Sequence, residues 1–239
     1  RRSSYGRVMR PRDLPSISQF CKRVRSRRAQ ALIDRVFELL SGRDEHTALA
    51  CIDGKALPIG DATRDPDAGN GRGGGRFSRG YKAHVLADSL GRVRCFHITK
   101  IQVGEPPVAR ERLVEHIPRG CVVLADANYD GRELYADIGR RGAFLLTPQK
   151  RNKRTEAAFR KTSAKRRAAM ELWRDHPKLA RRVYALRAHI ERVFSALTCF
   201  GGGLAPLPAW VRREGRVRRW VTAKIAIYNA RVLVRNAPS

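Results

Sequence analysis

The chain contains 239 residues, of which 42% are hydrophobic, so it can bury a sizeable core as one large or two small domains. Fifty lysines and arginines against 22 aspartates and glutamates give a formal net charge of +28, which indicates a polyanionic partner. This charge fits a ribosomal or chromatin-type protein as well as an enzyme that acts on nucleic acid. No apolar run approaches the roughly 20 residues of a membrane span, and no signal peptide is evident. We therefore expect a cytoplasmic protein without a membrane span.

The cysteines of the chain also fit a cytoplasmic protein. No two cysteines have the C-x-x-C spacing of a zinc site, and three of the five lie in apolar runs. We therefore expect buried, reduced thiols and no zinc centre. The cysteines are Cys21, Cys51, Cys95, Cys121 and Cys199.

The first part of the chain is basic and helix-prone. It opens on Arg1 rather than on methionine, and we expect it to be a piece of a longer product. Residues 16–41 predict one or two helices that end before a glycine. The basic run 22–28 either contacts phosphate or forms a solvated helix face. The apolar stripe expected to face the core consists of Ala31, Leu32, Val36, Leu39 and Leu40.

Two aspartates directly follow short apolar runs. Residues 48–52 precede Asp53 and residues 121–125 precede Asp126, and both runs have the length and composition of buried strands. A single aspartate in such a place more often only starts a turn. Two of them in a very basic protein, together with a glutamate on a helix, suggest a site where carboxylates hold a divalent metal against a phosphodiester.

That glutamate lies on a helix predicted within 181–200, where apolar positions recur at intervals of three and four residues. At roughly 100° per residue, Tyr184, Arg187 and Glu191 share a stripe about 60° wide beside the apolar face. A carboxylate placed there can point along the edge of the core into a cleft. The alternative for Arg187 is a plain pair with Glu191, one helical turn away, on a solvated surface.

Two other aspartates are expected to be structural. Asp88 falls in the turn of a hairpin predicted over 80–99. Asp130 stands three residues before Glu133, which is the pattern of a capping box at the start of a helix. Neither aspartate is expected to take part in chemistry.

The remaining elements complete an α/β pattern. The glycine-rich stretch 61–75 lacks the Gly-Lys-Ser/Thr ending of a phosphate-binding loop and is expected to be a mobile loop. A helix opens at Pro106, a fifth strand covers 143–147, and a last helix covers 220–234. Alternation of this kind predicts a mixed sheet of about five strands flanked by helices, with the two aspartate-bearing strands as neighbours.

Four segments carry a family resemblance through their order and spacing. They are Ala50–Lys55, Ser78–Val85, Val123–Asp126 with Tyr129 and Asp130 beyond it, and Tyr184–Arg192. Together they resemble the catalytic part of a bacterial insertion-sequence transposase of the IS4-like DDE group. The last segment matches the signature Y-(2)-R-(3)-E-(6)-K of that group in its first three members, whereas Thr198 stands where the lysine is expected.

The resemblance implies a ribonuclease H-like fold and a division of the chain. A catalytic domain would cover residues 47–200. A basic helical segment, 1–46, would be the remnant of an upstream DNA-binding region, and residues 201–239 would form a linker and a C-terminal helix.

The resemblance also implies a function. Asp53, Asp126 and Glu191 would be the catalytic, metal-binding triad, with two ions of Mg²⁺ or Mn²⁺. The substrate would be duplex DNA, both the transposon ends, which would be cut, and the target, to which a 3′-hydroxyl would be joined. The enzyme would act as a homodimer at the bacterial nucleoid. It would bind no membrane and no small-molecule substrate. The side chains expected to contact DNA are Tyr184, Arg187, Arg192, Arg76, Arg79 and Lys82.

Two other hypotheses remain open. A truncated or inactive transposase remnant would bind DNA without cutting it, which fits the start at Arg1, the presence of Thr198 and the lack of an evident helix-turn-helix motif. A structural RNA-binding protein would need no metal and predicts no clustering of the three acids. For Arg76, Arg79 and Lys82, plain surface charge is as good an explanation as DNA contact.

Overall fold

The computed structural model describes residues 15–42, 46–60, 64–73, 75–149, 162–199 and 203–237. Within these ranges, no helix has both the length and the apolar character that a bilayer crossing requires. The expectations for residues 1–14 and 150–161, and for most of the glycine run at 201–203, lie outside the described residues.

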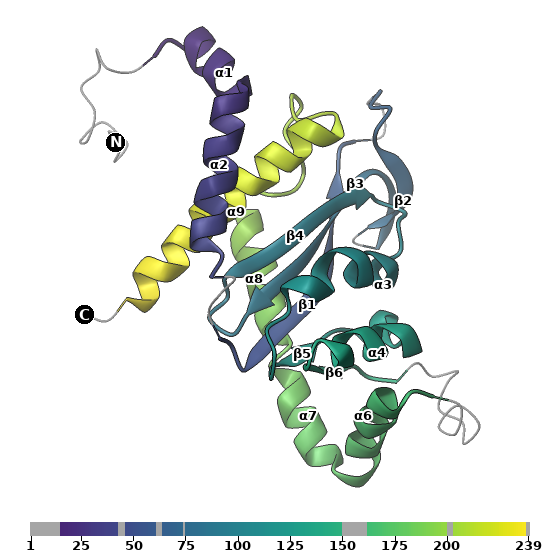
Figure 1. The fold of residues 1–239 in the computed structure, drawn as a ribbon. Coiled ribbons are helices and arrows are strands. Elements are labelled where there is room, and N and C mark those ends of the chain that lie inside the picture. The colour runs from purple at the N-terminus through teal and green to yellow at the C-terminus, as the bar shows by residue number, and fades with distance from the viewer. Residues whose placement is uncertain are drawn as a thin grey trace.

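One mixed sheet forms the centre of the described chain (Figure 1). Its order is β2-β3-β1-β5-β6, and β4 also pairs with β3. The pairs β3–β4 and β1–β3 are antiparallel, whereas β5 runs parallel to β1 and β6 runs parallel to β5. The strands are β1 (Leu49–Pro58), β2 (Gly69–Gly73), β3 (Arg76–Asp88), β4 (Val93–Lys100), β5 (Val122–Leu124) and β6 (Phe144–Leu146). The predicted mixed α/β sheet is confirmed.

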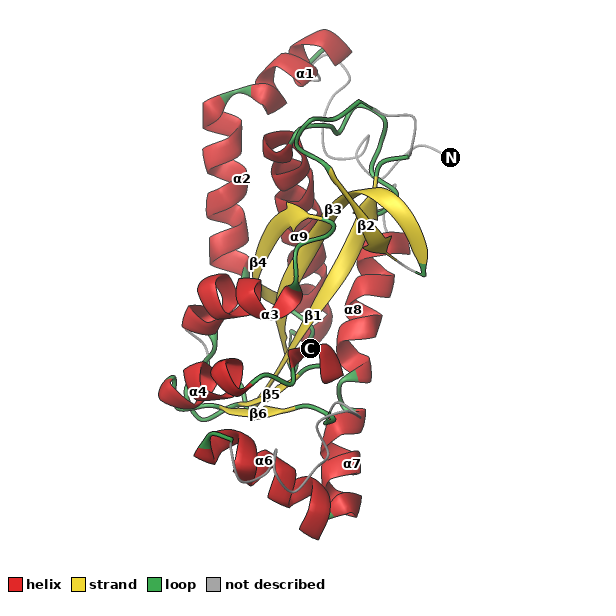
Figure 2. Cartoon of the chain, turned by 90° about the vertical axis from the view of Figure 1, so that its right-hand side faces the viewer, coloured by secondary structure: helices red, strands yellow, loops and turns green. Residues whose placement is uncertain are grey.

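Helices cover both faces of this sheet. They are α1 (Ile17–Arg25), α2 (Arg27–Leu40), α3 (Glu105–Val108), α4 (Arg132–Arg140), α6 (Ala164–Asp175), α7 (Pro177–Ala185), α8 (Ala188–Cys199) and α9 (Glu214–Asn236). Figure 1 shows α2 and α9 crossing beside β4, while α6 and α7 lie at the β6 end of the sheet. Figure 2 shows α8 running along β1 on the side away from α3.

The alternation of side chains along β1 divides the core into two parts. Cys51 packs in a cluster with Ile190 and Phe194 of α8, whereas its neighbour Ile52 packs in a second cluster with Leu113 and with Leu134 of α4. Both faces of β1 are therefore buried, which explains why the strand reads as an unbroken apolar run in the sequence.

Strand pairing extends further than the sequence predicted. Asp53 lies in the middle of β1 and not at its end, because β1 stays paired with β3 as far as Pro58, which faces Gly80. The predicted mobile loop, where it is described, contains β2, which pairs with the start of β3. A Cβ atom on Gly69 would lie 1.6 Å from Oε1 of Gln102, so any other residue there would displace the end of that side chain.

The helix pair α1–α2 was predicted, but its buried face was not. Leu32 and Leu39 of the predicted stripe are about two-thirds exposed, whereas Phe37 is buried. The ring of Phe37 packs edge to face against Phe96 of β4, with centroids 5.3 Å apart. This contact and the packing of α2 along α9 turn the helix away from the orientation that its own periodicity favoured.

Asp130 is structural, but it does not cap a helix. Gly131 holds the N-cap position of α4 and makes no side-chain cap, so the predicted capping box is wrong. Both carboxylate oxygens of Asp130 instead accept hydrogen bonds from Arg166 of α6, at 2.6 Å from Nε and 2.9 Å from Nη2. Both side chains are buried, so this pair ties α6 to the segment in front of α4.

We predict that Asp130→Ser lowers the free energy of unfolding by roughly 3 kcal/mol, because it leaves the Arg166 guanidinium buried without its carboxylate. Serine is itself a good capping residue, so a capping role would predict almost no change. Chemical denaturation distinguishes the two outcomes. Asp175→Ser removes a carboxylate from an exposed pair with Arg174 and serves as the control, with little change expected.

Candidate active site

The parallel pair β1–β5 places two carboxylates side by side. Cys51 of β1 is the register partner of Leu124 of β5, and Asp53 and Asp126 each follow two residues later. Asp126 begins a single 3₁₀ turn, and its Oδ1 accepts a hydrogen bond of 2.8 Å from the backbone N–H of Asn128. The structure thus brings together the two predicted aspartates.

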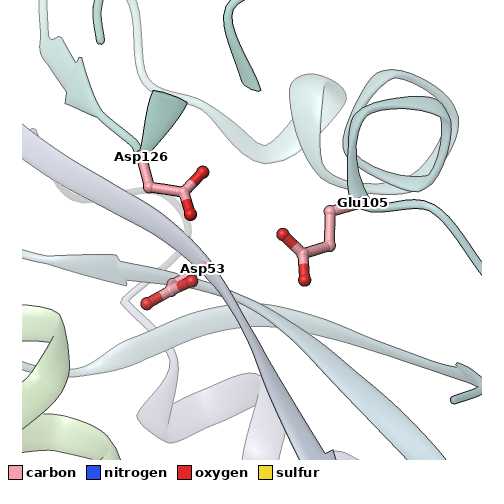
Figure 3. A group of neighbouring side chains, drawn as sticks. All are labelled: Asp53, Glu105 and Asp126. Carbon is pink, nitrogen blue, oxygen red and sulfur yellow. The ribbon is translucent and has the colours of Figure 1, made fainter. Parts of the chain in front are cut away.

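A third carboxylate, Glu105, joins them. Oxygen atoms of Asp53, Glu105 and Asp126 all lie within 4.8 Å of one another (Figure 3). Glu105 is the first residue of α3, directly after the loop that follows β4. The sequence patterns do not single out this residue. The available signal was an acid at the first helical position, before Pro106, which also describes many purely structural glutamates.

Glu191 lies beside this group and not within it. Its side chain is 64% exposed, whereas that of Asp53 is 16% exposed. The guanidinium of Arg187 bridges the two: Nη1 donates to Glu191 Oε1 at 3.1 Å and Nη2 donates to Asp53 Oδ2 at 3.0 Å. The pair with Glu191 that was the alternative for Arg187 is present, but Arg187 also reaches the buried aspartate.

Arg187 can bridge because the predicted continuous helix is interrupted at this point. The helix ends at Ala185 and restarts at Ala188. The N–H groups of Leu186 and Arg187 bond to carbonyls three residues earlier, at 3.1 and 2.9 Å, so the chain tightens into a 3₁₀ turn. The junction changes the direction in which Arg187 points, which periodicity alone did not predict.

A cleft of about 760 Å³ opens beside Asp53 and Glu191. Its walls come from the second half of β1, from α8 and from the chain that follows α8, and they include Lys55, Thr198 and Pro206. Thr198, in the place of the expected lysine, donates its hydroxyl hydrogen to the carbonyl of Phe194 at 2.7 Å. The only cationic side chain that lines this cleft among the described residues is therefore that of Lys55.

Among the described residues, the carboxylates of the site outnumber the cationic side chains at ion-pair distance from them. Burial raises the pKa of Asp53 to about 6, and the charges of Asp126 and Glu105 raise it as well, against the opposing effects of Arg187 and of the Gly54 N–H. The hydroxyl of Tyr129 is buried without a hydrogen-bond partner among the described residues. Burial, followed by the charges of the three carboxylates, raises the pKa of Tyr129 well above its ordinary value.

These features fit a divalent cation. Carboxylate oxygens are the ligands that hard cations such as Mg²⁺ and Mn²⁺ prefer. An ion among them would offset both the burial that raises the pKa of Asp53 and the smaller effect of repulsion by Asp126 and Glu105. The unpaired hydroxyl of Tyr129 is a further polar group that a hydrated ion would satisfy.

The other side chains predicted to contact DNA differ in whether they already have partners within the fold. Arg76 and Arg192 are exposed. Arg79 donates to the carbonyl of Asp65 at 2.7 Å, and Lys82 lies 3.2 Å from Glu105 Oε1, so both have partners within the fold. Tyr184 is half-buried, and its ring packs edge to face on that of Trp173 with centroids 5.8 Å apart.

Comparison with known proteins gives two matches. Residues 45–229 match the family model described as "Transposase DDE domain". No curated protein matches the chain. Among solved structures, the chain is similar to the piggyBac transposase in a cryo-EM synaptic complex with hairpin DNA, with a TM-score of 0.50 and 10% identity. The similarity covers 79% of this chain and 47% of that one, so the chain spans about half the length of this relative. The likeness confirms the predicted ribonuclease H-like fold.

The raised pKa of Asp53 predicts a pH dependence of stability. Because the folded pKa of about 6 exceeds the unfolded value of 3.8, the metal-free folded chain holds more protons between these two values. This contribution therefore lowers stability as pH rises from about 4 to about 6, and it is constant above that range.

We expect Asp53→Asn to become progressively more stable than the wild type across this window, reaching at most roughly 3 kcal/mol at neutral pH. Urea denaturation in the presence of EDTA measures the difference. A difference that is the same at pH 4 and pH 7 would contradict the raised pKa.

Proposed function

Because the chain belongs to the transposase DDE domain family, we propose that it cleaves DNA phosphodiesters at transposon ends and joins the 3′-hydroxyl to target DNA. The observation that supports this most is the placement of Asp53 and Asp126. They are far apart in the sequence, yet they follow paired residues of neighbouring parallel strands and share a cluster of carboxylates. A structural RNA-binding protein gives no reason for this arrangement.

Asp53, Asp126 and Glu191 are the catalytic carboxylates in this proposal, and Mg²⁺ or Mn²⁺ is the cofactor, as two ions. When bound, such ions activate a water or a 3′-hydroxyl and stabilise the leaving oxygen. The carboxylates of Asp53, on β1, and of Asp126, two residues after the end of β5, would hold the cations. Glu191, which is exposed at the cleft, faces the side from which DNA arrives.

Arg187 positions phosphate in this proposal. Its guanidinium already holds two carboxylates at 3.0 and 3.1 Å, so the fork is oriented before DNA binds. A phosphate, which presents similar oxygens, can take one of these places once cations neutralise Asp53. Lysine has no such fork and would not reproduce this contact.

The DNA path runs along the cleft beside α8. Arg192, on α8, and Arg76, at the start of β3, are exposed and supply charge near it. Lys55 lines the cleft together with Thr198 and restores the positive charge that the missing lysine would have supplied. The Tyr184–Arg187–Glu191 spacing supports membership of the IS4-like group. With that membership the proposal includes action as a homodimer on paired ends at the bacterial nucleoid.

We predict that Asp53→Asn, Asp126→Asn and Glu191→Gln each reduce metal-dependent nicking of supercoiled plasmid DNA by about a hundredfold or more, since each removes a proposed ligand. DNA affinity should be retained. Glu111→Gln, an exposed acid on the turn after α3, is the matched control and should nick like the wild type. If the wild type binds DNA and does not nick it with Mg²⁺ or Mn²⁺, the DNA-binding remnant is the better hypothesis.

Salt dependence tests the DNA path. Each phosphate contact contributes about 0.9 to the slope of log affinity against log salt concentration on duplex DNA. Arg192→Ala and Arg76→Ala should each lower this slope by about that amount, measured by fluorescence anisotropy over a salt series. Arg35→Ala, on α2, which contributes no residue to the cleft, should leave the slope unchanged. Equal slopes in all four proteins would remove these two arginines from the path.

A further inference from the structure

We propose that Glu105 is a metal ligand of this site, binding a divalent cation jointly with Asp53 and Asp126, in addition to the carboxylate of Glu191. The inference rests on the proposed function and adds a fourth acid to the three that the sequence resemblance supplies. It concerns a residue that belongs to none of the four segments carrying that resemblance.

The position of Glu105 in the fold favours this role. Asp53 comes from β1, Asp126 from the chain after β5 and Glu105 from the start of α3, so three separate elements converge (Figure 3). Their oxygens lie within 4.8 Å of one another. Opposite ligands of one magnesium ion are about 4.2 Å apart, since each Mg–O distance is about 2.1 Å. The cluster is therefore close to the size of a coordination sphere.

Gly54 is what allows Glu105 to approach. A Cβ atom at position 54 would lie 2.6 Å from Oε1 and 2.9 Å from Cδ of Glu105. Any other residue next to Asp53 would require this carboxylate to shift from its present position. An acid that served only solubility or helix capping would not need such a gap in the neighbouring strand.

Tyr129 gives an independent indication that a ligand is bound here. Its side chain is fully buried, and its hydroxyl has no hydrogen-bond partner among the described residues. It lies in the 3₁₀ turn that Asp126 begins, and the charges of Glu105, Asp53 and Asp126 all act on it. A buried polar group is normally satisfied, so an ion with its water shell would supply the missing partner.

Before DNA brings further negative charge, the charge balance already accommodates the first of the two proposed ions. Four acids, Asp53, Glu105, Asp126 and Glu191, meet two cations at ion-pair distance among the described residues. These cations are Arg187, which bridges Asp53 and Glu191, and Lys82, with Nζ 3.2 Å from Glu105 Oε1. Two negative charges remain, which is the charge that one Mg²⁺ or Mn²⁺ neutralises.

The competing explanation is that Glu105 serves only as the structural partner of Lys82. That pair is mostly buried, and Lys82 also donates to the carbonyl of Val103 at 3.2 Å. A structural pair predicts that loss of Glu105 changes stability and leaves metal affinity unchanged. If Glu105 is a metal ligand, its loss lowers the affinity for the metal itself.

Titration of the full chain with Mn²⁺, followed by the electron paramagnetic resonance signal of the free ion, separates these cases. We expect Glu105→Gln to weaken Mn²⁺ binding at least about tenfold, as loss of a group at a metal site does. Glu111→Gln, with the same change of charge on the adjacent turn, should bind like the wild type. Wild-type affinity in Glu105→Gln would overturn the proposal.

A second variant tests direct coordination. Glu105→Cys should bind Cd²⁺ with a new thiolate-to-metal charge-transfer band in the ultraviolet, because thiolates prefer soft cations. All the proteins in this test carry Cys199→Ser, because that exposed thiol lines the cleft and would itself bind Cd²⁺. In this background Glu111→Cys and the parent chain should not develop the band. Its absence in a folded Glu105→Cys protein would also overturn the role of Glu105.

Asp53→Asn in the same titration distinguishes failure of the role of Glu105 from failure of the proposed function. Loss of Mn²⁺ binding in Asp53→Asn, with wild-type affinity in Glu105→Gln, overturns the role of Glu105 and leaves the proposed function intact. No Mn²⁺ binding by a wild-type chain that also fails to nick DNA overturns both. Loss of binding in both variants, and not in Glu111→Gln, is the result we expect.

Discussion

The parallel pairing of β1 with β5 is the contact on which the site depends. In its register Cys51 lies opposite Leu124, so Asp53 and Asp126 follow at the same level. A slip of one residue would turn one aspartate to the other side of the sheet. Apolar residues on both faces of β1 prevent this slip. It would move Cys51 and Ile52 each into the half of the core that the other now fills. Burial of neighbouring side chains therefore holds two carboxylates together against their mutual repulsion.

That convergence has a cost, and the chain offsets it in part. Desolvation and like charges disfavour the ionised form of Asp53, whereas the positive charge of Arg187 favours it. Lys82 lies against Glu105 in the same way. These internal cations stand where a metal ion would otherwise supply positive charge. The same groups thus keep the acids paired in the free chain and can release them when cation and DNA arrive, which links the stability of the site to its proposed reaction.

Local sequence patterns were sufficient for part of this architecture. The apolar runs before Asp53 and Asp126 predicted two neighbouring strands, and the predicted hairpin is confirmed as β3 and β4, with Asp88 as the last residue of β3 directly before the turn. What the sequence did not predict depends on contacts between distant segments. Asp130 pairs with Arg166, 36 residues away, and α2 turns because Phe37 meets Phe96. Glu105 enters the site because Gly54 leaves room for it. No periodicity or motif around Gly54 or Glu105 predicts this contact.

The central claim is that carboxylates from separate elements of this chain converge to bind a divalent cation. Anomalous diffraction at the manganese absorption edge, from crystals of the chain grown with Mn²⁺ and DNA, tests it most directly. We expect anomalous density among the side chains of Asp53, Asp126 and Glu105. Manganese bound elsewhere on the chain, with no density between these carboxylates, would contradict the claim.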